Sequence, residues 1–223
     1  METIAIIPAR GGSKRLPGKN LMELGGIPLV AHSILYARSC GQVDGVYVST
    51  DDSKIKAVAL EYGAQVIDRP KAISGDNEPT VTALQHVLGQ IPAKRVVLLQ
   101  PTNPLRPMHL LSDALESFGR GTADSLFTVT RSHHKLGMIH EDSFIPYNYE
   151  PGQRSQDLEP LYYENGLLYV CGPEVIMAGQ IITPEAFPWI VEHPFGAADI
   201  DTLQDFEFAE FLYQKYKHEE SLP

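Results

Sequence analysis

The sequence contains few cysteines and no long apolar run, and these shortages exclude several classes of protein. Its 223 residues include only Cys40 and Cys171, with no Cys-x-x-Cys pair, which argues against a disulfide framework or a structural zinc site. No apolar stretch approaches the roughly 18 residues that span a bilayer. The chain opens directly into a strand-like run without the pattern of a signal peptide. We therefore expect a soluble, cytoplasmic protein that does not enter a membrane.

Positive charge is also scarce. The chain has 18 basic and 28 acidic residues and a formal net charge of −10, so its bulk surface is expected to repel nucleic acid and anionic membranes. Four of the basic residues are nevertheless close together, namely Arg10, Lys14, Arg15 and Lys19. On an acidic protein, such a cluster indicates a small anionic ligand.

Short apolar runs alternate with helical patterns along much of the chain. Strands are predicted at residues 3–8, 45–49, 64–67, 95–100, 125–130 and 166–170. Apolar residues at helical spacing occupy most of the segments between them, and a last helix is predicted over 202–216. The alternation predicts an α/β fold with a doubly wound, mostly parallel sheet in a single domain over residues 1–223. Residues 131–162 are polar and break the rhythm, so we expect an inserted lid or dimerisation arm there.

The loop after the first strand has the composition of a phosphate site, and ligands of open α/β sheets bind beyond the carboxyl ends of the strands. Gly11 and Gly12 are expected to adopt positive φ, with successive N–H groups forming an anion nest, while Arg10 holds a phosphate bidentately. The spacing excludes a Walker A motif and the dinucleotide fingerprint G-x-G-x-x-G. A solvated basic loop would have the same composition, so composition alone leaves both interpretations open.

Two polar features further along the chain are also ambiguous. Asp199 and Asp201 are two residues apart, so in an extended segment both carboxylates point to one side, as a Mg²⁺ site requires. Asp201, with Gln204 three residues later, is equally a candidate N-cap of the last helix. Gln100 ends a predicted buried strand, where it is either a ligand-reading amide or a polar strand terminus.

Six segments in order along the chain make the interpretation specific. They are Ile7-Pro-Ala-Arg-Gly-Gly-Ser-Lys-Arg-Leu-Pro-Gly-Lys-Asn20, Val48-Ser-Thr-Asp51, Arg69-Pro70, Leu99-Gln-Pro-Thr-Asn-Pro-Leu-Arg106, Asn165-Gly-Leu-Leu-Tyr169 and Asp199-Ile-Asp-Thr202. The first closely resembles the opening motif of the acylneuraminate cytidylyltransferases, the CMP-sialic acid synthetases, and the others match that family in the expected order. The resemblance covers nearly the whole chain.

The resemblance implies an enzyme that transfers CMP from CTP to the anomeric hydroxyl of a nine-carbon sugar acid and releases pyrophosphate. It implies a nucleotide site formed by Ala9, Arg10, Gly11, Gly12, Ser13, Lys14, Lys19, Asn20, Arg69 and Gln100. Within this site Arg69 is expected near the cytosine. Arg10, Lys19 and Asp201 are expected to be catalytic, and Asp199 and Asp201 to bind Mg²⁺, with Mn²⁺ as an alternative.

The resemblance also implies a sugar site and a homodimer with shared active sites. The sugar site comprises Gln100, Arg154, Tyr169, Ile181 and Ile182. Arg154 is expected to reach the partner's sugar, and Lys135 is the nearest candidate for a second cation from the arm. Ile181 and Ile182 are expected on the strand after Tyr169, where relatives selective for N-acetylneuraminate carry paired aromatics, so the identity of the sugar stays open. Tyr169 is also compatible with a plain core position.

Two other functions remain possible from the residues. The related 3-deoxy-manno-octulosonate cytidylyltransferases share the fold and the chemistry. The chain is also compatible with a catalytically inactive nucleotide-binding module. The full loop over residues 9–20 fits the sialic branch better, and the presence of Arg10, Lys19, Asp199 and Asp201 argues against an inactive module.

Overall fold

Strand β1 (Thr3–Pro8) is apolar on both faces and lies inside the sheet of this computed structural model, which describes residues 1–220. Ala5 and Ile7 pack into the core on one face of the sheet and Ile4 and Ile6 into the core on the other, and all four are fully buried. β1 pairs in parallel with β4 (Gly45–Thr50) and with β6 (Arg95–Leu98). The continuous apolar run is therefore that of a strand covered on both sides.

Seven strands form the central sheet in the order β11-β7-β10-β6-β1-β4-β5. The other strands are β5 (Gln65–Asp68), β7 (Ser125–Ser132), β10 (Leu161–Cys171) and β11 (Phe187–Ile190). β5 is parallel to β4 and β11 is parallel to β7, whereas β10 runs antiparallel to both β6 and β7. The expected mostly parallel sheet is confirmed, with β10 as its reversed strand.

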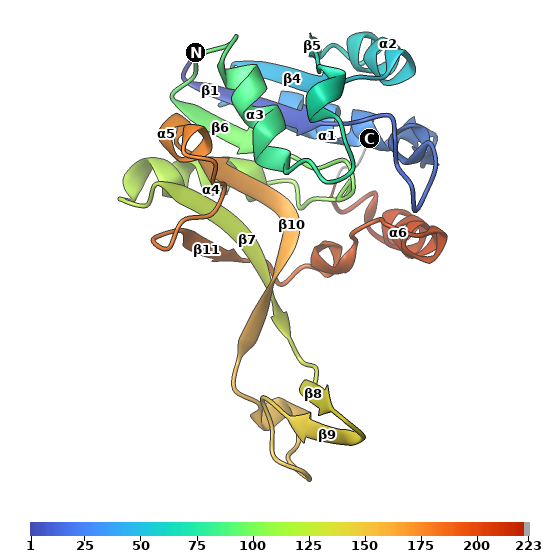
Figure 1. Cartoon of the computed structure of the whole chain (residues 1–223), viewed down its shortest axis with the longest axis vertical. Coiled ribbons are helices and arrows are strands. Elements are labelled where there is room, and N and C mark those ends of the chain that lie inside the picture. Colours follow the sequence, from blue (N-terminus) through green and yellow to red (C-terminus); the bar gives the residue numbers. More distant parts are fainter. Residues whose placement is uncertain (221–223) are drawn as a thin grey trace.

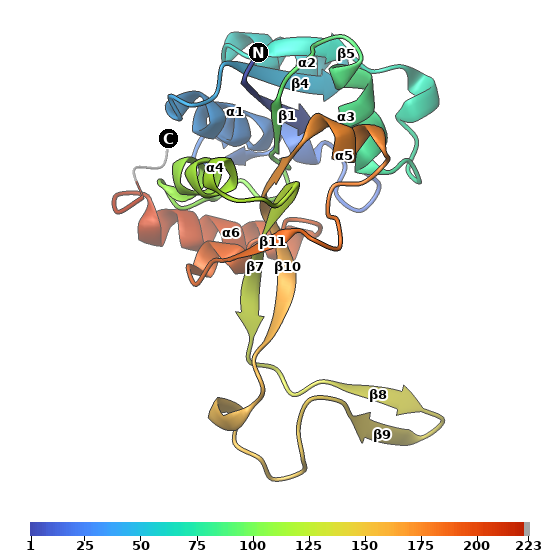
Figure 2. The same ribbon diagram turned by 90° about the vertical axis from the view of Figure 1, so that its left-hand side faces the viewer.

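Helices cover both faces of the sheet, as the doubly wound pattern predicted (Figures 1 and 2). Helices α1 (Leu29–Ser39), α2 (Ser53–Glu61) and α4 (Leu110–Arg120) pack on the face of Ala5 and Ile7. Helices α3 (Thr80–Leu88) and α5 (Pro173–Met177) pack on the opposite face. Helix α6 (Leu203–Tyr216) joins the hairpin of β2 (Glu23–Leu24) and β3 (Ile27–Pro28) in a third apolar cluster. Short 3-10 helices are η1 (Lys19–Leu21), η2 (Lys71–Ile73), η3 (Ser155–Asp157) and η4 (Pro194–Ala197).

Two sequence predictions about strands are wrong in detail. β6 ends at Leu98, so Gln100 lies in the loop beyond the strand rather than at its last position. Ile181 and Ile182 lie in a bend rather than on a strand, and the next strand begins only at Phe187. Pro184 follows closely and cannot donate a hydrogen bond to a sheet, which is consistent with the irregular backbone of this segment.

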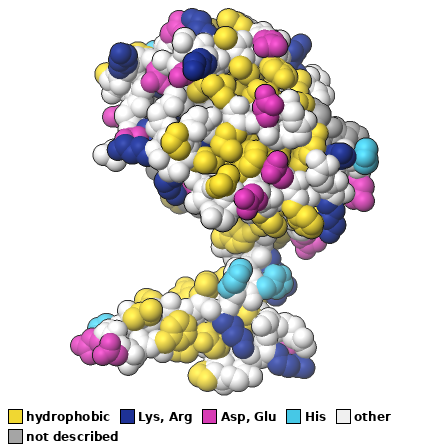
Figure 3. Space-filling view, turned by 90° about the vertical axis from the view of Figure 1, so that its right-hand side faces the viewer, with side chains coloured by type: hydrophobic (Ala, Val, Ile, Leu, Met, Phe, Trp, Pro, Cys, Tyr) yellow, Lys and Arg dark blue, Asp and Glu magenta, His cyan; other side chains and the backbone are white. Residues whose placement is uncertain are grey.

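The segment between β7 and β10 forms an arm that projects away from the rest of the molecule (Figures 1 and 2). β8 (Gly137–His140) and β9 (Ser143–Pro146) make an antiparallel hairpin, and β7 and β10 extend as a two-stranded stalk in which Leu161 pairs with Ser132. The sequence of residues 131–162 is polar, but the hairpin of the arm exposes several large apolar side chains. Figure 3 shows hydrophobic side chains gathered along it, and the exposed ones include Met138, Ile139, Phe144, Ile145 and Tyr147.

Within residues 1–220, none of the helices combines the length and the apolar character needed to cross a membrane.

Candidate functional site

The loop that follows β1 is tied into the fold at both of its ends. The Ala9 N–H donates to the carbonyl of Ser49 on β4 at 3.0 Å, and the buried Asn20 side chain donates to the carbonyl of Arg10 at 2.9 Å. Gly18 has φ 72° and is the N-cap of η1, which carries Lys19 and Asn20. These hydrogen bonds fix the backbone of the loop, so it is not simply a solvated basic segment.

Gly11 is required by a close approach and not by positive φ. In the loop over residues 9–20 only Gly18 has positive φ, so the expectation of positive φ at Gly11 and Gly12 is wrong. The Gly11 N–H donates to Asp51 Oδ1 at 3.0 Å, so this amide is not available for an anion nest. A Cβ on Gly11 would lie 2.7 Å from Oδ2 and 2.8 Å from Cβ of Asp52, whereas a Cβ on Gly12 meets nothing within 4 Å.

The two glycines therefore make a matched pair. We expect Gly11→Ala to weaken binding of CTP, the nucleotide that the family resemblance implies, by about tenfold and to lower the melting temperature, because the added methyl group forces the loop away from Asp52, which caps α2. The estimate of about tenfold corresponds to the 1–3 kcal/mol typical of overpacking. Gly12→Ala is expected to stay within about twofold of the native protein. Calorimetric titration with CTP and thermal unfolding of both variants measure the difference, and equal effects would contradict it.

Asp76 is paired with two of the cations that the sequence assigns to phosphate. Its carboxylate lies 2.7 Å from Arg10 Nη1 and 2.5 Å from Lys14 Nζ. The Lys14 ammonium, together with Arg10, holds the pKa of Asp76 below its ordinary value. Sequence reasoning missed Asp76, because it lies 66 residues from Arg10 in a segment with no recognisable pattern.

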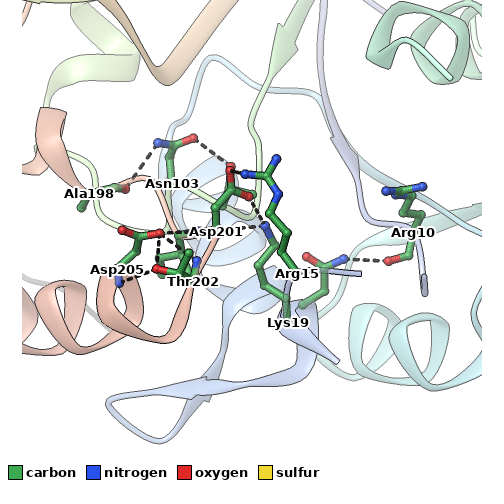
Figure 4. Close-up of polar contacts among 11 residues, drawn as sticks. Arg10, Arg15, Lys19, Asn103, Ala198, Asp201, Thr202 and Asp205 are labelled. Carbon is green, nitrogen blue, oxygen red and sulfur yellow. Dashed lines mark hydrogen bonds and ion pairs between the residues drawn. The ribbon is translucent and has the colours of Figure 1, made fainter. Parts of the chain in front are cut away.

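Lys19 and Asp201 form the centre of the site (Figure 4). Lys19 Nζ donates to the carbonyl of Ile200 at 2.7 Å and lies 3.0 Å from Asp201 Oδ1, and only 8% of Lys19 is exposed. Arg15 Nη1 lies 2.9 Å from the other oxygen of Asp201. These contacts join the first loop to the segment before α6, nearly two hundred residues later.

The capping alternative for Asp201 is wrong. The N-cap of α6 is Thr202, whose hydroxyl accepts from the Asp205 N–H, while the Asp205 carboxylate accepts from the Thr202 N–H at 2.7 Å. This is a capping box, and its signal in the sequence is the spacing Thr-x-x-Asp, which the prediction overlooked. The Asp201 carboxylate is thereby left for the pocket rather than for the helix.

Asp199 is two residues from Asp201 in the sequence and is influenced by its charge. Asp199 is exposed to solvent, but partial desolvation still raises its pKa above the ordinary value; the Asp201 charge adds to this rise, whereas a hydrogen bond from Thr102 opposes it. Within residues 1–220 no cluster of three or more His, Cys, Asp or Glu side chains is placed to hold a metal. Two carboxylates are nevertheless a suitable donor set for Mg²⁺ or Mn²⁺, because such ions are commonly bound by one or two carboxylates together with substrate phosphates.

Most residues of the predicted nucleotide site line one pocket of about 490 Å³. The predicted residues along its wall are Arg10, Ser13, Lys14, Lys19, Asn20, Arg69, Gln100 and Asp201. Ala9 is fully buried behind the wall, and Gly11 and Gly12 are not on it. Arg69 is fixed by hydrogen bonds from Nε and Nη2 to the side chain and carbonyl of Ser49, at 3.0 and 2.7 Å, and burial lowers its pKa.

A second pocket of about 350 Å³ holds the predicted sugar residues Tyr169, Ile181 and Ile182. Gln100 lines both pockets, as do Pro79 and Thr80, so the two cavities meet at Gln100. Sequence reasoning missed Glu164, which also lines the second pocket and directly precedes the Asn-Gly motif. Arg154 lies on the arm, paired with Asp157 at 2.7 Å, and lines neither pocket of its own chain.

The loop carrying Gln100 rests on the buried Arg106. Its guanidinium donates to the carbonyls of Leu167 and Gln100 at 2.6 and 2.8 Å and to the Ser33 hydroxyl at 3.2 Å. Burial lowers the pKa of Arg106 to about 10, so it remains a cation at neutral pH. The sequence shows Arg106 only as the last residue of the motif over residues 99–106 and does not predict that it supports the loop of Gln100.

Comparison with known proteins agrees with this geometry. The cytidylyltransferase family model matches residues 4–216. The chain belongs to the cytidylyltransferase family. This confirms the family resemblance inferred from the six motifs. The relatives of this cytidylyltransferase are named as cytidylyltransferases or as a CMP-sugar synthase, which are nucleotidyltransferases.

Three curated relatives differ in the sugar that their names specify. The pseudaminic acid cytidylyltransferase of Campylobacter jejuni is 33% identical, with 98% of this chain and 99% of the relative covered. The CMP-N,N'-diacetyllegionaminic acid synthase of Legionella pneumophila is 32% identical, with 96% and 97% covered. The N-acylneuraminate cytidylyltransferase of Streptococcus agalactiae is 32% identical, and the match covers 92% of this chain but 52% of that protein.

Solved structures show the same fold at lower sequence identity. CMP:2-keto-3-deoxy-manno-octonic acid synthetase complexed with CTP has a TM-score of 0.74 at 18% identity, with 96% of this chain and 99% of that chain covered. The 4-diphosphocytidyl-2C-methyl-D-erythritol synthase of Anaerococcus prevotii has a TM-score of 0.69 at 16% identity, with 96% of both chains covered. The fold class expected from strand and helix alternation is confirmed by both.

Proposed function

We propose that this cytidylyltransferase transfers CMP from CTP to the anomeric hydroxyl of a nine-carbon sugar acid. The observation that carries the proposal is the pair of pockets that meet at Gln100, one lined by cations and the other largely by apolar side chains. The names of the relatives, which specify pseudaminic, legionaminic and N-acylneuraminic acids, support the same class of acceptor.

In the proposed reaction, the sugar hydroxyl oxygen bonds to the α-phosphorus of CTP, the bond from that phosphorus to the bridging oxygen breaks, and pyrophosphate leaves. Such a transfer depends mainly on positioning and on charge stabilisation. Arg10 and Lys19 are assigned to the phosphates, and Arg69 to the cytosine side of the pocket. Arg10 exchanges Asp76 for phosphate oxygens when the nucleotide enters, so one anion replaces another at the same guanidinium.

Asp199 and Asp201 are the residues that would hold a divalent cation. Bound there, the ion would supply positive charge to the phosphates. In the structure Asp201 is ion-paired with both Lys19 and Arg15, and these contacts orient its carboxylate at the edge of the pocket. Gln100, supported from behind by Arg106, is assigned to the boundary between nucleotide and sugar.

Pyrophosphate release with CTP, Mg²⁺ and a panel of sugar acids tests the proposal. The panel includes N-acetylneuraminate, its deaminated analogue, legionaminate, pseudaminate and 3-deoxy-manno-octulosonate. We expect release with at least one nine-carbon acid and not with the octulosonate alone. Release with the octulosonate only would favour the eight-carbon activity, and CTP binding without release would favour an inactive nucleotide-binding module.

We also propose that the arm pairs two chains. The exposed apolar side chains of its hairpin form a surface that a second copy would bury, and Arg154 on the same arm would then reach the partner's sugar site. The arm and the sheet would remain parts of one domain, because β7 and β10 run through both.

Light scattering at micromolar concentration is expected to give twice the chain mass of 24.7 kDa. Ile139→Glu should convert the protein to a monomer, because Ile139 is 80% exposed on the hairpin and a charge there would be buried by pairing. Leu60→Glu on α2, where Leu60 is 54% exposed, is the matched control and should leave the mass unchanged. A monomeric native protein would contradict the proposal.

A further inference from the structure

The second pocket has a chemistry of its own. Val81, Ile181 and Ile182 give it an apolar wall, and Gln100, Tyr169 and Glu164 give it a polar one. Among the described residues that line it there is neither lysine nor arginine, and Glu164 is the one acidic residue. A carboxylate ligand would therefore meet only negative charge there, whereas a neutral polar group would not.

Glu164 reaches this pocket because of an irregularity in β10. Glu164 and Tyr169 are five residues apart, so in a regular strand their side chains would lie on opposite faces of the sheet. The pairing of β10 with β7 shifts register between these two residues, where Gly166 has φ 74°. Asn165 fixes the irregularity, since its side chain accepts from the Leu167 N–H at 3.1 Å and donates to Thr130 Oγ1 at 2.9 Å. The shift brings both side chains to the same pocket.

The hydrogen bonds along the polar wall all run in one direction. The Gln100 amide donates to the Tyr169 hydroxyl at 3.5 Å, and that hydroxyl donates to Glu164 Oε1. Burial, reinforced by Glu164, raises the pKa of Tyr169, so the hydroxyl keeps its proton and directs it to the carboxylate. Because the Tyr169 hydroxyl donates to Oε1, the second carboxylate oxygen of Glu164 is the one left to accept a hydrogen bond from a ligand.

We propose that Glu164 determines specificity for the sugar by accepting a hydrogen bond from an N–H donor on a substituent remote from the sugar carboxylate. An acylamido group suits the pocket, because its N–H meets Glu164 while its short alkyl part meets the apolar wall. The same charge keeps the sugar carboxylate out of this pocket and so sets which way round the sugar binds. The inference rests on the proposed function, because it assumes that a sugar acid enters the second pocket.

Two sugar acids that differ at one carbon test the inference, one carrying an acetamido group and the other hydrogen at that position. The native protein is expected to favour the acetamido sugar in kcat/KM. Glu164→Leu should lower that preference about tenfold or more, because it removes the acceptor of a charge-assisted hydrogen bond. The KM for CTP should not change. Glu185→Leu, an exposed position that lines neither pocket, is the control for loss of one negative charge and should keep the native preference.

A purely structural role for Glu164 predicts a different pattern. If the carboxylate only holds the Tyr169 hydroxyl, Tyr169→Phe and Glu164→Leu would slow both sugars equally and leave their ratio unchanged, which would overturn the inference. Loss of the ratio in Glu164→Leu, with Tyr169→Phe retaining most of it, supports the inference. If the native protein releases no pyrophosphate with any sugar acid, the proposed transfer fails, and calorimetric titration of the same two sugars then decides. Tighter binding of the acetamido sugar that disappears in Glu164→Leu supports the inference, and equal binding overturns it.

Discussion

Replacing Asp201 with asparagine is expected to lower kcat by about a hundredfold or more while the protein stays folded. Removal of one preorganised electrostatic group from an active site commonly has an effect of about this size. Asparagine keeps the shape of the side chain but loses the negative charge that faces Lys19 and Arg15 and that we assign to a divalent cation. The loss should be largest at limiting Mg²⁺, which steady-state kinetics over a range of Mg²⁺ concentrations will show.

Asp205→Asn is the matched control, four residues further along the chain. Its carboxylate caps α6, so the substitution should cost about 1 kcal/mol of folding free energy and leave kcat near the native value. Steady-state kinetics should therefore show the loss of activity in Asp201→Asn, and thermal unfolding should show the loss of stability in Asp205→Asn. Near-native turnover of Asp201→Asn at limiting Mg²⁺ would mean that the Lys19–Asp201 pair is only a structural tie between the first loop and α6.

Lys19→Met is expected to lower kcat/KM for CTP by about a hundredfold, and Lys14→Met by less than about tenfold. Both ammonium groups are candidates for the triphosphate, but Lys19 is held in place by Ile200 and Asp201 and is only 8% exposed. The Lys14 side chain is 79% exposed and contacts only Asp76 among acidic groups of the described chain. A fixed, partly desolvated charge acts more strongly than a mobile charge in water.

Methionine is a suitable replacement at both positions because it keeps the length of the lysine stem. Initial rates at varied CTP, with the sugar acid saturating, give the two values of kcat/KM directly. Lowering the ionic strength should strengthen the contribution of Lys14 more than that of Lys19, because exposed charges are the ones that salt screens. Equal losses in the two variants would contradict the assignment of Lys19 as the central cation.

Several features of the fold and the site could be predicted from local sequence. The apolar run over residues 3–8 predicts a strand covered on both faces, and the structure confirms it. The basic loop that follows had to lie at the carboxyl end of this strand, and it does so beside Arg69 and Gln100 in one pocket. These predictions succeed because chain direction and side-chain periodicity, which local sequence specifies, determine them.

Other features depend on contacts between distant segments. The pairing of Asp76 with Arg10 requires two loops to meet, and nothing near Asp76 in the sequence indicates its partner. Gly11 lies against Asp52 of another loop, a close approach that local sequence does not indicate, and the expectation of positive φ at Gly11 and Gly12 is wrong. The N-cap of α6 is different, because the Thr-x-x-Asp spacing that favours Thr202 over Asp201 is local, and the prediction overlooked it.

Strand β10 also restricts how this chain can change in length. Its first residues pair with β7 in the stalk of the arm, and its last residues pair with β6 in the middle of the sheet. Inserting or deleting one residue between Glu164 and Tyr169 would reverse the face on which Glu164 lies relative to Tyr169 and turn its carboxylate away from the second pocket. Changes in the length of the arm are therefore expected to be tolerated in the hairpin and its loops, where they leave the wall of the second pocket intact.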